Sequence, residues 1–254
     1  MTVDLVPIQG SLDSLKSQVK GSKLVIPSIS IGNVPQLSAD LFIHNLQTKL
    51  VAQLDSTYLY PFASPVDYVD NGKQVDHDVG VSTALELYYN EELNLSIIQQ
   101  RSPILSDYSQ NFLDYLVSVV TELEFNEVLL LDSNDHALKT DLNYSDPIEL
   151  YSNDLNERFK SLNVSNTSNL DKAKELFTPF VSNLIHNLNN TTTITALLIY
   201  VYEGDNFYDA ELFTKKALDV LNISIPSNFQ KPKSWGGVYG DRPIPTGYEE
   251  GLFG

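Results

Sequence analysis

The hydrophobic positions along the chain alternate between a period of two, typical of strands, and a period of three to four, typical of helices. Strands are predicted at 23–31, 55–60, 84–90, 93–100, 127–132 and 193–202. Helices are predicted after Ser38 as an N-cap, and over 108–123, 171–189 and 207–221. Strands that alternate with helices in this way indicate an α/β fold with a mixed central β-sheet and helices on both faces.

The same pattern divides the chain into one α/β domain and two less regular ends. Residues 1–22 are polar and lack a strong period, so they are predicted to form a loosely ordered N-terminal extension. Residues 23–225 form the domain, in which the Asn-, Asp- and Ser-rich stretch 133–170 is predicted to be a loop-rich insertion. Prolines and glycines recur after residue 225, so 226–254 is predicted to be an irregular C-terminal tail.

The composition is strongly acidic, with 16 Lys and Arg against 33 Asp and Glu in 254 residues and a formal net charge of −17. A nucleic-acid partner and an anionic membrane are not expected, because both attract basic surfaces. The chain has no cysteine, which excludes disulfides and zinc thiolate sites. No signal peptide is predicted in residues 1–20, and no apolar run is long enough to span a bilayer. A cytoplasmic or nuclear location is therefore expected.

One group of residues is similar to a catalytic site. Asp132, Asp135 and His136 follow the strand at 127–132, and α/β folds place functional groups at the carboxyl ends of strands. They support an alternative hypothesis, an α/β enzyme of the hydrolase or phosphorylase type, whereas the simpler interpretation is a polar strand exit. The other histidines, His44, His77 and His186, lie in unrelated settings without the helical spacing of a zinc site.

Two further motifs are better explained by local structure than by chemistry. Glu203-Gly204-Asp205 with Asp209 offers oxygen ligands to a divalent cation, but it lacks the EF-hand pattern, and Asp205 or Asn206 suits the N-cap of the next helix. The glycines at 236, 237 and 240 are followed by no Lys-Ser/Thr pair, so they do not form a phosphate-binding loop. No catalytic residue, metal or cofactor is expected.

Four segments remain that are apolar or aromatic in places that a core alone does not explain. They are Leu24–Ser38 with its Gly32-Asn33-Val34-Pro35-Gln36-Leu37 turn, Ala84–Pro103 with its Gln99-Gln100-Arg101 exit, Tyr202–Asn206, and Ser234–Gly240 with Trp235. In order and spacing, these four motif segments resemble those of the proteasome assembly chaperone 2 family of fungi and animals. Four matches in order identify the chain as a member of that family, on the fungal side, and the resemblance covers residues 23–254.

The resemblance implies a chaperone and not an enzyme, without nucleotide or metal. It implies an obligate heterodimer with proteasome assembly chaperone 1 that promotes assembly of the α ring and the core particle. The pair would hold correctly arranged proteasome α subunits and block premature activator binding by occupying the same pockets. This chain departs from the family in having about 22 residues before the first motif segment.

The resemblance also implies a docking role for the last three residues, Leu252, Phe253 and Gly254. Family members and proteasome activators end in a hydrophobic residue, a tyrosine and any last residue, which enter a pocket between neighbouring α subunits. An aliphatic anchor, an aromatic anchor and a terminal carboxylate that pairs with a lysine fit such a pocket. Phe253 stands where the family has tyrosine, so a hydrogen bond worth about 1 kcal/mol is absent.

Overall fold

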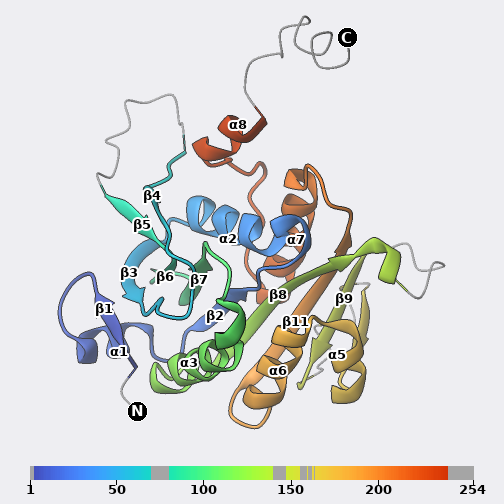
Figure 1. Cartoon of the computed structure of the whole chain (residues 1–254), viewed down its shortest axis with the longest axis horizontal. Coiled ribbons are helices and arrows are strands. Elements are labelled where there is room, and N and C mark those ends of the chain that lie inside the picture. Colours follow the sequence, from blue (N-terminus) through green and yellow to red (C-terminus); the bar gives the residue numbers. More distant parts are fainter. Residues whose placement is uncertain are drawn as a thin grey trace, which may run out of the picture.

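The computed structural model describes residues 3–69, 80–139, 147–154, 159, 162 and 164–239. These residues form one mixed β-sheet with helices on both faces (Figure 1), which confirms the predicted α/β class. In the described part, the strand order is β1-β3-β6-β7-β2-β8-β11-β9-β10. The strands are β1 (Leu5–Pro7), β2 (Lys23–Pro27), β3 (Lys49–Leu54), β6 (Leu85–Asn90), β7 (Leu95–Gln100), β8 (Glu127–Asp135), β9 (Ile148–Ser152), β10 (Ser165–Thr167) and β11 (Thr193–Val201).

The central strands β7, β2, β8 and β11 run parallel, and antiparallel pairs flank them through β6 and β9. A separate two-stranded sheet pairs β4 (Ala63–Pro65) with β5 (Val81–Thr83). The helices around the main sheet are α1 (Leu12–Val19), α2 (Val34–Asn45), α3 (Ser109–Glu122), α5 (Leu170–Leu176), α6 (Pro179–Leu188) and α7 (Phe207–Leu221). A further helix, α8 (Lys233–Tyr239), packs on α7 through Trp235.

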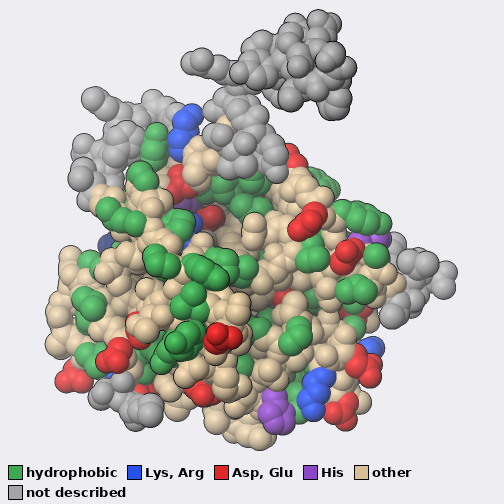
Figure 2. Space-filling view, in the orientation of Figure 1, with side chains coloured by type: hydrophobic (Ala, Val, Ile, Leu, Met, Phe, Trp, Pro, Cys, Tyr) green, Lys and Arg blue, Asp and Glu red, His purple; other side chains and the backbone are tan. Residues whose placement is uncertain are grey.

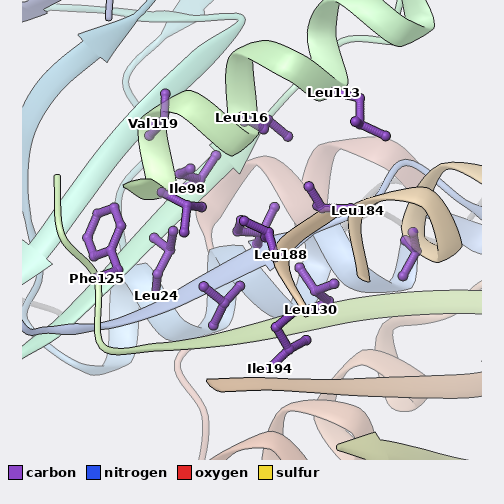
Figure 3. Close-up of a cluster of buried hydrophobic side chains, with 14 of the residues drawn as sticks. Leu24, Ile98, Leu113, Leu116, Val119, Phe125, Leu130, Leu184, Leu188 and Ile194 are labelled. Carbon is purple, nitrogen blue, oxygen red and sulfur yellow. The ribbon is translucent and has the colours of Figure 1, made fainter. Parts of the chain in front are cut away.

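Side chains of the central strands alternate between two hydrophobic cores, one on each face of the sheet. Along β8, Val128 and Leu130 join the core under α3 and α6, whereas Leu129 and Leu131 join the core under α2 and α7. Figure 3 shows the first core, where leucines of α3 and α6 point toward Leu130 and Ile194. The apolar run at 128–131 is continuous because both faces of this strand are covered.

The predicted loose extension at 1–22 is wrong for the residues that the structure describes. β1 pairs antiparallel with β3 at the sheet edge, and α1 begins with a capping box between Ser11 and Ser14. Leu15 and Val19 of α1 are buried. The Tyr115 hydroxyl of α3 donates a hydrogen bond to the Asp4 carbonyl oxygen at 2.8 Å. Tertiary contacts order both elements: β1 has only three residues and shows no period, and α1 carries just two buried apolar residues, Leu15 and Val19, among polar ones.

Several predicted boundaries also move. The strand predicted at 55–60 lies at 49–54, because Asp55 caps a turn by accepting a hydrogen bond from the Thr57 N–H at 2.9 Å. The helix assigned to a Ser38 cap begins at Val34 with Asn33 as N-cap, and Ser38 is buried. The helix predicted at 171–189 is two helices, because Pro179 disfavours helical backbone at Thr178.

The stretch 133–170 contains the end of β8, together with β9 and β10, so it is not a loop insertion alone. β9 lies inside the sheet beside β11, and its register pairs Leu150 with Leu197. Residues 226–254 likewise contain α8. β9 and α8 are both short, and the polar residues on either side of them make them hard to recognise in the sequence. His77 and the predicted docking residues Leu252, Phe253 and Gly254 lie outside the described residues.

Candidate functional site

The carboxyl ends of β2 and β8 are where an α/β fold of this topology is expected to bind a ligand. α2, which follows β2, packs on one face of the sheet, and α5 and α6, which follow β8 after β9 and β10, pack on the other. This arrangement places a crevice between the two strand ends. Here the crevice is filled by hydroxyl groups of the chain itself. The Ser30 and Ser133 hydroxyls lie 2.7 Å apart, and the Ser133 hydroxyl donates to the Ile31 carbonyl oxygen at 2.6 Å.

The Asp132 side chain also lies in this crevice and is fully buried. It accepts hydrogen bonds from the Ser28 hydroxyl at 2.6 Å, the Thr178 N–H at 2.8 Å and the Ser133 N–H at 3.0 Å. Burial raises the pKa of Asp132 above its ordinary value, and these three donors oppose the shift. Asp132 therefore ties β2 and β8 to the junction between α5 and α6, and it has no open path to a substrate.

The other two residues of the predicted catalytic group have separate local contacts. Asp135 accepts a hydrogen bond from the Ala137 N–H at 2.8 Å and caps the turn η3 (His136–Leu138). The His136 ring packs against the Tyr202 ring with 4.8 Å between centroids. In the described part of the chain, no group of three or more His, Cys, Asp or Glu is placed to hold a metal ion. The structure thus does not bring Asp132, Asp135 and His136 together.

The first and third motif segments meet at the start of α7. Gly32 has a left-handed backbone with φ of +66°, and a Cβ at this position would come within 2.5 Å of the Asn206 Oδ1. Only glycine permits this approach without displacing Asn206. Asn206 is the N-cap residue of α7, and its Nδ2 donates to the Tyr202 carbonyl oxygen at 2.9 Å and to Asp209 at 3.0 Å.

The fourth motif segment lies over the same corner. The Trp235 ring stacks on the Phe207 ring of α7 with centroids 4.5 Å apart and 9° between the planes. Asp67 accepts hydrogen bonds from the Ser234 N–H at 3.1 Å and from the Ser234 hydroxyl. Just before α8, the backbone of Gln230 makes two hydrogen bonds with the side chain of Asn45 in α2. These contacts fix the residues that lead into α8 across α2 and α7.

A buried charged network joins the first and second motif segments. The Arg101 Nη2 lies 3.1 Å from the Asp40 Oδ1, and both side chains are largely buried. The Gln99 amide donates to the same Asp40 oxygen at 2.7 Å and to the Gln36 carbonyl oxygen at 3.1 Å. Burial lowers the pKa of nearby His44; the charge of Asp40 opposes this shift.

The four motif segments share one further property. Within the described residues, the buried side-chain polar atoms without a hydrogen-bond partner in the protein are Gln36 Oε1, Gln99 Oε1, Arg101 Nε, Asn206 Oδ1 and Trp235 Nε1. All of them belong to the four motif segments. An unpaired buried polar atom costs about 1–3 kcal/mol, so this corner is not arranged for stability alone. It is the candidate functional site of the chain.

The same corner is hollowed. The Glu203–Gly204 turn and the loop after β2 border a depression of about 530 Å³, lined by Ile29, Ser30, Ile31, Gly32, Asn33, Glu203 and Gly204. Sequence reasoning identified the motif segments but missed Asp40, Asp67 and Phe207, which hold them together. Those residues lie far apart along the chain, and an acidic or aromatic residue alone carries no signal of its tertiary partner.

A model described as "PAC2 family" matches residues 24–222, which is most of the chain. The chain belongs to the PAC2 family. Among its PAC2 relatives, "Proteasome assembly chaperone 2" of Saccharomyces cerevisiae is 31% identical over 254 aligned residues, which cover 86% of this chain and 95% of the relative. The protein of the same name from Xenopus laevis is 27% identical over 89% of this chain and 94% of its own length. The family resemblance seen in the sequence is confirmed.

Solved structures share the PAC2 fold. "Pyrococcus furiosus PbaA, an archaeal homolog of proteasome-assembly chaperone" aligns with a TM-score of 0.61 at 14% identity, covering 89% of this chain and 88% of that one. "Pyrococcus furiosus PbaB, an archaeal proteasome activator" aligns with a TM-score of 0.59 at 17% identity, covering 89% and 92%. The PAC2 match ends at residue 222, so Trp235 and the residues after it lie beyond the matched part.

Proposed function

We propose that this chain is a proteasome assembly chaperone subunit that acts by binding and not by catalysis. The observation that carries the proposal is the 31% identity to the Saccharomyces cerevisiae proteasome assembly chaperone 2, which extends over nearly the whole length of both chains. The hydroxyl groups and Asp132 that fill the crevice between β2 and β8 support a function without a buried substrate site.

In this proposal the chain forms a heterodimer with proteasome assembly chaperone 1 and binds proteasome α subunits in the cytoplasm or nucleus. Leu252, Phe253 and Gly254 dock in a pocket of the α ring. Fifteen residues follow Tyr239, and an extended chain reaches about 3.3 Å per residue, so they span up to about 50 Å. The hydrogen bonds of Asn45 to Gln230 and of Asp67 to Ser234 anchor the start of α8 and the residue stretch before it, and they thereby set the point on the body from which the tail is delivered.

The deciding experiment is purification of the tagged chain from its own cells, followed by mass spectrometry of the bound proteins. We expect to recover proteasome α subunits together with a second chaperone subunit in an amount equal to that of the tagged chain. A matched purification of an unrelated acidic protein of the same charge controls for nonspecific binding to basic proteins. Recovery of neither the α subunits nor a second chaperone subunit would refute the proposed function.

The absence of catalysis is tested with Asp132→Asn, which removes a possible general base but keeps an acceptor oxygen for the Thr178 N–H. We expect the folded variant to support core-particle assembly in cells at the level of the unchanged chain, measured per mole of chaperone. The free energy of unfolding should fall by about 1–3 kcal/mol, because the new amide donor replaces an acceptor in a buried network. A fully folded variant that fails to support assembly would favour the alternative hypothesis that the chain is an enzyme.

A further inference from the structure

Three of the most exposed large hydrophobic side chains in the described part lie near the carboxyl ends of β8 and β11. Leu138, Tyr202 and Tyr208 are 60%, 67% and 75% exposed, and together they are called the edge patch here. The pairing of Val201 with Asp135 brings Tyr202 beside the turn η3, which contains Leu138. Side chains of this size rarely remain exposed together unless they bind another surface.

The surroundings of the edge patch are acidic. Glu203 and Asp205 are exposed on the turn between Tyr202 and Tyr208, and Asp135 and Asp209 are partly exposed beside it. Neither Glu203 nor Asp205 forms an ion pair with any described residue. Figure 2 shows hydrophobic and acidic side chains together in the upper right, over the end of β8 and the start of α7. An apolar centre with an acidic rim is complementary to an apolar surface bordered by lysine or arginine.

The edge patch lies next to the residues that deliver the tail. Tyr208 follows Phe207, on which the α8 residue Trp235 stacks at 4.5 Å. The depression of about 530 Å³ lies between the Glu203–Gly204 turn and the loop after β2, so this side of the body combines a hollow with an exposed apolar surface. A protein that holds the end of the tail therefore has its own surface within reach of the edge patch.

We propose that the edge patch is a second contact with the protein that receives the tail, which rests on the proposed function. Its occupant is the outer surface of the α ring, where an apolar group bordered by lysine or arginine meets Tyr202 and Tyr208. Two contacts joined by a short tail strengthen each other, because binding of one raises the effective concentration of the other. The edge patch also gives the body a fixed orientation on the ring, which contact at the last three residues alone does not provide.

The test compares the double variant Tyr202→Ser/Tyr208→Ser with the control Val6→Ser/Tyr60→Ser. The control removes two exposed apolar side chains, 63% and 48% exposed, from other parts of the surface. Each variant is purified in complex with its chaperone partner and titrated with purified proteasome core particle. We expect the edge-patch variant to bind about tenfold or more weakly and the control to bind unchanged, because exposed aromatic residues dominate such interfaces.

A charge-reversal variant, Glu203→Lys/Asp205→Lys, tests the acidic rim. We expect weaker binding at low salt, and a smaller loss of affinity than the unchanged chain shows when the salt concentration is raised. Removing residues 252–254 as well should weaken binding beyond the effect of either change alone. Unchanged binding by the edge-patch variant, or loss of the chaperone partner instead of the core particle, would overturn the proposal. If the unchanged chain itself does not bind the core particle, the proposed function fails and not the edge patch alone.

Discussion

Deletion of residues 252–254 is expected to weaken binding of the chaperone heterodimer to the α ring by tenfold or more. The change removes the aliphatic anchor Leu252, the aromatic anchor Phe253 and the native position of the terminal carboxylate. Burial of a leucine and a phenylalanine side chain stabilises a complex by about 1.5–3 kcal/mol each, and a loss of 1.4 kcal/mol is already tenfold in affinity. Titration of purified core particle with the truncated and the intact heterodimer measures the effect.

Two matched variants separate the tail motif from a merely apolar chain end. Phe253→Tyr restores the hydroxyl that the family carries and should retain affinity or raise it by up to about fivefold, the equivalent of 1 kcal/mol. Addition of one residue after Gly254 moves the carboxylate and should weaken binding as much as the truncation does. The heterodimer and the thermal stability of the chain should be the same in all three variants. Full affinity of the truncated heterodimer would show that the body alone binds the ring.

Arg101→Leu is expected to lower the free energy of unfolding by about 3–5 kcal/mol. The substitution leaves the Asp40 carboxylate buried without its cation, while the Gln99 amide remains as its neutral donor. An uncompensated buried charge is costly because it has lost its hydration and has no opposite charge nearby. Urea unfolding of the purified variant, followed by circular dichroism, measures the change in free energy.

The chain offers a matched control in the ion pair between Lys231 and Glu211. Its atoms are also 3.1 Å apart, but the Lys231 side chain is 51% exposed. Lys231→Leu should therefore cost less than about 1 kcal/mol. The double variant Asp40→Leu/Arg101→Leu should recover much of the lost stability, because no unpaired charge remains. Equal losses for Arg101→Leu and Lys231→Leu would show that burial of the Asp40 pair is not what stabilises this corner.

The sequence alone determined the elements whose periodic pattern is strong. Several elements lie where their apolar spacing predicts them: the β6–β7 hairpin, α3, β8, β11 and α7. The reason is that the apolar residues of these strands and helices pack against each other between the sheet and its covering helices. The same pattern predicts the α/β class, since strands that alternate with helices pack in layers. The order of the four motif segments along the chain also indicates the PAC2 family, whose model matches residues 24–222, without reference to any spatial contact.

Short and polar elements were decided by tertiary structure. β1 is ordered by its pairing with β3, α1 is ordered by the burial of Leu15 and Val19, and β9 lies inside the sheet although its flanks are polar. A strand of three to five residues has too few positions to display a period, and the energy that fixes it comes from partners distant in sequence.

For the candidate site, too, the sequence indicates some features and the tertiary structure decides the others. The sequence supplied Gly32, Arg101, Asn206 and Trp235 as members of separate motif segments, but it gave no reason for them to meet. Only the fold brings Gly32 against Asn206 and Trp235 against Phe207. It also decides that Asp132 is enclosed by its own hydrogen-bond donors, because burial depends on what the rest of the chain places around a side chain, and a linear pattern does not contain that information.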